Sequence, residues 1–249
     1  MKPGGSARNR LDQELAQRGL CPSREVARRL ILAGKVTVGG RLAGKPGMSV
    51  PADAEIVVKE GPRFVSRGGD KLEGALEAFG IEAREQICLD AGASTGGFTD
   101  CLLQRGAARV YAFDAGFNQL AWKLRSDPRV VVRERFNLRY LQPADVSEPI
   151  DLLVVDVSFI SLTLVLPPCL AVLRDGGQAV CLIKPQFELQ RGEVGRGGVV
   201  RDEELRQKAP RKIESFVAGQ LGMRWMATID SRLPGATGNR EFFGWIRKE

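Results

Sequence analysis

Two patterns of apolar and polar residues divide this chain of 249 residues. From residue 70 onward, continuous apolar runs of strand length alternate with segments whose apolar positions recur every three or four residues, as in amphipathic helices. We expect helices at 70–80, 96–106, 118–125 and 164–173, strands at 86–90, 108–116, 129–137, 151–159 and 177–186, and an antiparallel edge pair at 225–233 and 240–249. The pattern predicts an α/β fold with helices on both faces of an open, mostly parallel sheet.

The first sixty residues follow another pattern. Apolar positions at helical spacing predict two short helices, marked by Leu11, Leu15 and Leu20 and by Val26, Leu30 and Ile31. Ser23 is the expected N-cap of the second helix, and "KVTVGGRL" at 35–42 predicts a hairpin with a Gly-Gly turn. Two short helices and a small hairpin with arginines on one face resemble the S4 RNA-binding domain. We therefore predict a small α+β S4-like domain at 1–60, a linker at 61–67 and a catalytic domain at 68–249.

The excess positive charge lies in the S4-like region. The chain carries 37 Lys and Arg against 30 Asp and Glu, and residues 1–48 hold ten of the former and three of the latter. A basic module on a neutral body favours contact with a polyanion such as structured RNA. A solvated face or a disordered basic arm is the alternative. The arginines predicted to contact RNA are Arg10, Arg24, Arg28, Arg29, Arg41 and Arg67, with Arg191, Arg196 and Arg201 in the glycine-rich loop "QRGEVGRGGVVRD".

Composition excludes several classes of protein. The chain has no histidine, so a His-dependent catalytic pair or metal site is excluded, and we predict no metal. The five cysteines show no C-x-x-C spacing, which favours reduced core thiols in a cytoplasmic protein. No apolar run follows the basic start, and the uncharged run at 157–173 is short and contains two prolines. We expect no signal peptide and no membrane span.

The stretch "CLDAGASTGGFTDCL" at 88–102 predicts a strand, a glycine-rich turn and a helix, which is a common seat for a nucleotide-like ligand. Its spacing is G-x-x-x-G-G and not the G-x-G-x-x-G of dinucleotide sites. Asp114 ends the next strand, where an acid accepts hydrogen bonds from a ribose. S-adenosylmethionine, which carries no phosphate, is favoured over a dinucleotide or a purely structural turn. The predicted cofactor residues are Asp90, Gly92, Ser94, Thr95, Gly96, Gly97, Phe98, Asp114, Asn137 and Asp156.

Four charged residues near strand ends are candidates for catalysis. Asp156 and Lys184 each close an apolar run, Lys71 precedes the first strand, and Glu241 opens the last. Lysine is rarely buried unless it is paired or functional. Two surface ion pairs are the alternative.

The motifs "VSRGGDKL", "CLDAGASTGGFTDCLLQRGA", "DVSFISL", "KPQFE", "VGRGGVVRD" and "GNREF" together resemble the TlyA family, often labelled hemolysin A. Its members are S4-linked rRNA 2′-O-methyltransferases with an FtsJ-type fold. The resemblance implies a Rossmann-like class I methyltransferase domain with a seven-stranded sheet. It also implies a tetrad at Lys71, Asp156, Lys184 and Glu241, an interdomain linker at 63–66 that affects cofactor binding, and cytidines of 16S or 23S rRNA, within 30S or 50S subunits, as targets.

This chain departs from the family pattern at two places. Asp70 occupies a position that is usually apolar, and the histidine common after "VVRD" is missing. Neither position belongs to the tetrad. A consequence is expected for cofactor affinity, because Asp70 adjoins Lys71.

The mechanistic hypothesis is in-line transfer of the sulfonium methyl group to a ribose 2′-oxygen. Lys184 would be the base or the oxyanion partner, with Lys71 as a second cation. Asp156 would orient Lys184, and Glu241 would hold Lys71 or the ribose. Phe187 would stack on a splayed base or lie in the core.

Three rival functions remain. A cytolysin needs an amphipathic or spanning segment, which this sequence lacks. A non-catalytic RNA-binding assembly factor has no need of paired lysines at strand ends. A base-amine methyltransferase tends to carry an Asn/Asp-Pro-Pro-aromatic run where this chain has "DVSFIS". The nucleotide, the ribosomal subunit and the oligomeric state stay open, with a monomer favoured.

Overall fold

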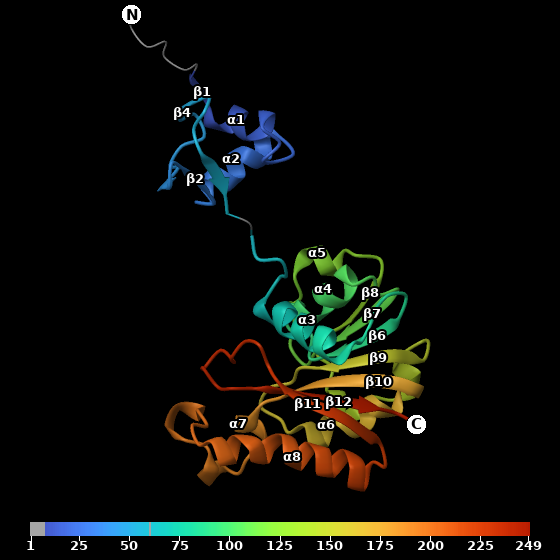
Figure 1. Ribbon diagram of the computed structural model, residues 1–249. Helices are drawn as coiled ribbons and strands as arrows, with labels where there is room; N and C mark the ends of the chain where they lie inside the picture. Colours follow the sequence, from blue (N-terminus) through green and yellow to red (C-terminus); the bar gives the residue numbers. More distant parts are fainter. Residues whose placement is uncertain (1–7, 60) are drawn as a thin grey trace, which may run out of the picture. The chain divides into compact units, whose positions relative to one another are not determined.

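The computed structural model describes residues 8–59 and 61–249 and separates into two compact units, Met1–Arg63 and Phe64–Glu249 (Figure 1). The first seven residues of the predicted S4-like domain, and Glu60 at its end, lie outside the described residues. The division between the units falls inside the segment 61–67 that the sequence predicts as a linker.

The first unit contains the predicted helices and hairpin. Its helices are α1 (Leu11–Gln17) and α2 (Arg24–Leu32), and the side chain of Ser23 caps α2 by accepting a hydrogen bond from the Val26 amide. A three-stranded sheet has the order β3 (Arg41–Leu42), β2 (Val36–Val38), β5 (Ile56–Val58), and β1 (Arg8–Arg10) pairs with β4 (Ser49–Pro51). A small apolar core joins helices and sheet through Leu11, Leu15, Ala27, Ile31 and Val36. Leu20, expected on the first helix, lies beyond its end.

The second unit is built on a seven-stranded sheet of order β11-β12-β10-β9-β6-β7-β8. The strands are β6 (Ile87–Ala91), β7 (Arg109–Phe113), β8 (Val130–Arg133), β9 (Ile150–Val155), β10 (Leu173–Ile183), β11 (Arg224–Asp230) and β12 (Phe242–Arg247). The strands β6 to β10 pair in parallel, and β12 is antiparallel to both of its neighbours. The predicted mostly parallel, seven-stranded α/β sheet is confirmed.

Helices cover both faces of this sheet (Figure 1). One apolar core holds residues of α3 (Arg67–Phe79), α4 (Gly97–Gln104) and α5 (Trp122–Arg125) against one face. The other core holds α6 (Leu162–Ala171) and α8 (Glu203–Gln220) against the opposite face. Because the central parallel strands are buried on both sides, their sequences contain continuous apolar runs, as in "DLLVVD" of β9.

Several predicted element boundaries were wrong. The helix predicted at 118–125 forms only at Trp122–Arg125, and the strand predicted at 129–137 ends at Arg133. The sequence analysis missed α8, the 18-residue helix at Glu203–Gln220, which contains Pro210 and many charged residues. Short one-turn elements fill the connections: α7 (Pro185–Glu188), η1 (Leu138–Tyr140), η2 (Pro143–Asp145), η3 (Arg191–Glu193) and η4 (Arg196–Gly198).

The segment that enters the second unit is held against α4. Phe64 is buried in the core beneath α3, and the Val65 amide donates a hydrogen bond to Asp100 Oδ2 at 2.8 Å. Ser66 caps α3 by accepting from the Gly68 amide. This contact fixes the start of α3, which carries Lys71.

Candidate active site

The site lies where the chain leaves the central strands β6 and β9 in opposite directions. From β6 the chain continues to β7 and β8, whereas β9 leads to β10 on the other side. Ligands of open α/β sheets bind at this crevice, outside the carboxyl ends of the strands. Here Gly92 follows β6 with φ +97°, and a Cβ on it would lie 2.2 Å from the Asp156 carbonyl oxygen. Only glycine permits this close approach of the two strand ends.

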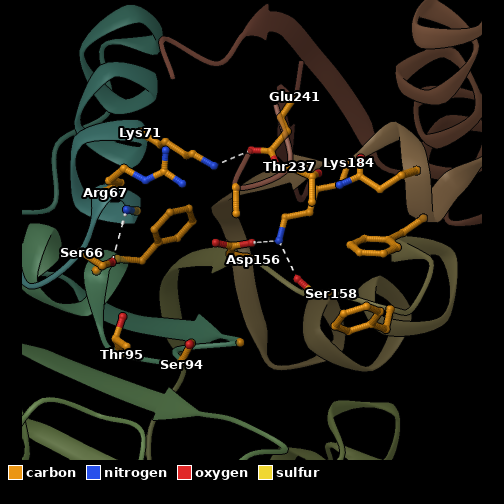
Figure 2. Close-up of a pocket in the computed structure, with 18 of the residues that line it drawn as sticks. Ser66, Arg67, Lys71, Ser94, Thr95, Asp156, Ser158, Lys184, Thr237 and Glu241 are labelled. Atoms are coloured by element: carbon orange, nitrogen blue, oxygen red, sulfur yellow. Dashed lines mark hydrogen bonds and ion pairs between the residues drawn. The ribbon is translucent and has the colours of Figure 1, made fainter. Parts of the chain in front are cut away.

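A cavity of about 550 Å³ opens at this edge, and the four candidate catalytic residues line it (Figure 2). Lys71 comes from α3, Asp156 follows β9, Lys184 follows β10, and Glu241 precedes β12. The structure therefore brings together side chains that lie up to 170 residues apart in sequence.

The four residues form two ion pairs. Lys71 Nζ donates to Glu241 Oε2 at 2.5 Å, and both side chains are buried, with 10% and 3% of their surface exposed. Lys184 Nζ lies 2.5 Å from Asp156 Oδ1 and donates to Ser158 Oγ at 2.9 Å. The pairs are not the exposed surface bridges of the alternative interpretation, since both lysines are largely enclosed.

A second cavity, of about 860 Å³, adjoins the first and shares with it Gly92, Ser94, Asp156, Ser158 and Phe159. Asp114 and Asn137 line this second cavity, as expected for residues that hold one ligand. Asp114 also shapes the turn itself, because its carboxylate accepts hydrogen bonds from the amides of Ser94 and Gly116. Asn137 Oδ1 accepts from the Arg139 amide and caps η1.

The remaining predicted cofactor residues surround the glycine turn. Ser94 and Thr95 are exposed at the first cavity, and Gly97 and Phe98 line it from the start of α4. Gly96 is buried behind them, where a Cβ would lie 2.3 Å from Leu124. The turn therefore packs against Leu124 of α5 on one side and faces the cavities on the other.

Asp90 lies beneath the turn and lines neither cavity. It is fully buried, and its Oδ2 accepts a hydrogen bond from Thr99 Oγ1 at 2.6 Å, whereas Oδ1 has no hydrogen-bond partner among the described residues. Burial raises the pKa of Asp90 to about 7, with Asp156 and Asp114 adding to the rise and Thr99 opposing it. Its part in cofactor binding stays a prediction.

These features fit S-adenosylmethionine. The two adjoining cavities and the absence of a side chain at Gly92 offer space for an extended, positively charged ligand. Asp114 and Asp156, which line the cavities, offer acceptors for its ammonium and hydroxyl groups. A pyrophosphate would meet carboxylates at the same edge, which disfavours a dinucleotide.

The sequence analysis missed an aromatic residue at the boundary of the two cavities. Phe159 is 92% exposed, has φ +64° and stands 5.2 Å, centroid to centroid, from Phe187. A non-glycine residue with positive φ and an exposed ring is unusual and marks functional sites. The motif "DVSFIS" contained the signal, because its phenylalanine follows the strand-end acid by three residues and so lies beyond the strand, in the connection at the ligand-binding edge of the sheet. Phe187 lines the first cavity and is partly exposed. It is therefore not a core residue.

The predicted RNA-contacting arginines fall into two groups. In the first unit Arg10 and Arg24 both bind the buried carboxylate of Asp12, while Arg28, Arg29 and Arg41 are exposed. The hydrogen bond from Arg10, together with that from Arg24, lowers the pKa of Asp12 to about 2, against the opposing effect of burial. Asp12 thereby fixes part of the basic surface. The predicted RNA-contacting arginines of the second unit are all exposed: Arg67, which stands at the first cavity, and Arg191, Arg196 and Arg201 in the glycine-rich loop.

All five cysteines are free and buried, as predicted for core thiols. Burial raises the pKa of Cys169 and of Cys181 to about 12, which leaves these thiols unreactive. Within residues 8–59 and 61–249, no helix has the length and apolar character needed to cross a bilayer.

Comparison with known proteins agrees with this architecture. Residues 64–248 match the family of FtsJ-like methyltransferases, and residues 9–56 match the S4 domain. The chain is 50% identical over 244 residues to the 16S/23S rRNA (cytidine-2′-O)-methyltransferase TlyA of Mycobacterium tuberculosis, covering 97% of this chain and 91% of that protein. It is 43% identical to Hemolysin A of Brachyspira hyodysenteriae, over 94% of this chain and 97% of that one.

A solved structure gives the same result. A protein from Streptococcus thermophilus, provisionally described as a hemolysin, is 42% identical with a TM-score of 0.73, over 97% of this chain and 88% of its own. The resemblance inferred from sequence motifs is therefore confirmed. The chain belongs to the FtsJ-like methyltransferase family, in its S4-containing TlyA branch.

Proposed function

We propose that this protein transfers a methyl group from S-adenosylmethionine to the ribose 2′-oxygen of a cytidine in 16S or 23S rRNA. The observation that carries the proposal is the pair of enclosed lysine–carboxylate contacts, Lys71–Glu241 and Lys184–Asp156, which face one cavity. The named activity of the 50% identical relative supports the choice of reaction and of RNA.

The cofactor residues follow from the two cavities. In the second cavity, Asp114 would accept hydrogen bonds from the ribose hydroxyls of the cofactor, and Asn137 would adjoin the cofactor's base. The turn at Gly92–Phe98 would hold the amino-acid part from below. S-adenosylmethionine, when bound, supplies an electrophilic methyl group on a sulfonium.

The residues of the first cavity would act on the target ribose. A 2′-hydroxyl is a weak acid, so its oxygen needs a proton acceptor or a cation as negative charge develops. Lys184 already donates to Ser158 and contacts Asp156, which favours the role of oxyanion partner over that of base. The proton of the 2′-hydroxyl would then pass to solvent as the methyl group is transferred. Asp156 and Ser158 orient its ammonium group. Glu241 holds Lys71 in place as the second cation at the cavity.

Aromatic side chains would hold the base of the target nucleotide. Phe159 presents an exposed ring at the boundary of the cavities, and Phe187 stands beside it. Stacking on aromatic side chains is how proteins hold unpaired RNA bases. The S4 unit would supply further contacts to the rRNA of free 30S or 50S subunits. The reaction would take place in the cytoplasm.

The test measures transfer of tritium from labelled S-adenosylmethionine to purified 30S and 50S subunits. We expect label in an alkali-resistant dinucleotide, because a 2′-O-methyl group blocks alkaline cleavage. Lys184→Ala should reduce the rate at least about 100-fold. Lys248→Ala is the matched control, since this lysine binds the carbonyl oxygen of Leu173 at the opposite end of the sheet and should retain the wild-type rate.

Two results contradict the proposal. Label in alkali-sensitive RNA would indicate methylation of a base. No transfer to either subunit, despite cofactor binding measured by calorimetry, would favour a non-catalytic RNA-binding factor.

A further inference from the structure

A buried asparagine joins two loops at the first cavity. Asn239, in the connection between β11 and β12, is 1% exposed. Its Oδ1 accepts from the Val200 amide at 2.9 Å, and its Nδ2 donates to the Gly198 carbonyl at 2.7 Å and to Thr237 Oγ1 at 3.1 Å. A side-chain amide offers one carbonyl acceptor and two N–H donors, so Asn239 uses both of its polar atoms here.

The two loops that Asn239 joins both line the tetrad cavity. We call residues 195–200 and 235–239 the roof. Gly197 and Gly198 line the cavity from one loop, and Ala236 and Thr237 line it from the other. The second cavity, which holds Asp114 and Asn137, has no contribution from the roof.

The roof also touches a tetrad residue. A Cβ on Gly235 would lie 2.4 Å from Glu241 Oε1, so the loop lies directly on this carboxylate. The Gly235 amide donates to the Asn239 carbonyl at 2.8 Å, which closes the loop two residues before Glu241. A shift of this loop would therefore change the position of Glu241 and, through their ion pair, the position of Lys71.

The other loop carries the exposed Arg196. The chain is bound to α8 on both sides of this residue, because Arg206 Nε donates to the Val200 carbonyl at 2.9 Å and Lys208 pairs with Glu193. Arg196 lies between these anchors, in a segment with positive φ at Gly197 and Gly198. The glycines of this segment allow many backbone conformations, and the hydrogen bonds of Asn239 attach it to the β11–β12 connection.

We propose that Asn239 is a positioning residue, which holds the two loops as one roof and so keeps Arg196, a predicted RNA contact, in a fixed relation to Glu241. The proposal rests on the proposed function. It assigns Asn239 an effect on use of the RNA, not on binding of the cofactor, because the roof contains no predicted cofactor residue and does not line the second cavity, where Asp114 and Asn137 lie.

The test uses Asn239→Asp, which keeps size and the acceptor for Val200 but loses the N–H donors to Gly198 and Thr237. Two lost hydrogen bonds correspond to about a tenfold or larger effect. We expect amide exchange at 195–200 to accelerate about tenfold or more, kcat/KM for the ribosomal subunit to fall by a similar factor, and the calorimetric Kd for S-adenosylmethionine to stay within about twofold. Thr237→Val removes one of these bonds from the partner side and should give a smaller change in the same direction.

Val217→Ala controls for a loss of stability alone. Val217 is buried in the core on α8, so its truncation lowers Tm without touching the roof. The proposal is overturned if Asn239→Asp, at matched Tm loss, changes neither exchange at 195–200 nor kcat/KM beyond Val217→Ala, or if cofactor affinity falls as much as RNA use. If the wild type methylates neither subunit, the proposed function fails. Exchange at 195–200 and filter binding of subunits then decide the role of Asn239.

Discussion

The Lys71–Glu241 pair permits a quantitative test of how this site is built. Lys71 Nζ and Glu241 Oε2 are 2.5 Å apart, with 10% and 3% of the two side chains exposed. The perturbation is a double-mutant cycle that removes each charge at nearly constant volume: Lys71→Met, Glu241→Gln and the two together. The cycle isolates the interaction from the separate effect of each substitution.

The burial of the pair sets the expected magnitude. Removing one partner of a buried ion pair leaves an uncompensated charge and costs about 3–5 kcal/mol, whereas replacing both by neutral groups is close to neutral. We therefore expect each single variant to lose about 3 kcal/mol or more of unfolding free energy. The double variant should lose far less than the sum of the two single losses, giving a coupling of at least about 3 kcal/mol.

The chain contains a matched control. Arg232 and Glu77 form an ion pair at 2.7 Å between α3 and the connection after β11, with 58% and 45% of the side chains exposed. This pair links nearly the same segments, but water screens it. The cycle Arg232→Met with Glu77→Gln should give a coupling below about 1 kcal/mol.

The assay is urea unfolding followed by tryptophan fluorescence. All three tryptophans, Trp122, Trp225 and Trp245, belong to the second unit, so the signal reports this unit alone. Equal coupling energies for the two pairs would refute the argument from burial. The double variant should also fail to methylate RNA while remaining folded; full activity would show that the pair serves stability only.

Two further predictions concern charge. Burial raises the pKa of Asp90 to about 7 from an ordinary value near 4, so its stabilising contribution is present below about pH 4 and is lost as pH rises to about 7, at about 1.4 kcal/mol per pH unit. Thermal or urea unfolding of wild type and Asp90→Asn from pH 5 to pH 8 should show the wild type losing stability relative to the variant up to about pH 7; a constant difference would contradict the raised pKa. In the S4 unit, the Arg28→Gln/Arg29→Gln double variant should reduce, by about two, the magnitude of the slope of log association constant for ribosomal subunits against log salt concentration. The control variant Arg247→Gln should keep the wild-type slope. An unaltered slope in the double variant would show that Arg28 and Arg29 do not contact RNA phosphates.

Sequence reasoning succeeded where local pattern and burial agree. The parallel strands appear as apolar runs because both faces of the sheet are covered, and the S4 helices show their periodic apolar positions. It failed for α8, whose helix contains Pro210 and is polar on most of its surface, because α8 packs through few residues such as Ala209, Ile213 and Val217. Tertiary contact stabilises this helix more than its local sequence does.

The sequence by itself determined the order of the seven strands, of the helices other than α8, and the glycine turn, since these depend on apolar runs and motif spacing. The resemblance to the TlyA family implied the four residues of the tetrad. The tertiary structure supplied the distances and the burial of the two expected lysine–carboxylate pairs. It alone decided that Asp90 lies beneath the turn, that Phe159 is exposed, and that Asn239 joins two loops. The physical reason is distance along the chain: Lys71 and Glu241 are 170 residues apart. Their contact depends on how α3 and β12 pack around the same sheet edge, and no local pattern records that packing.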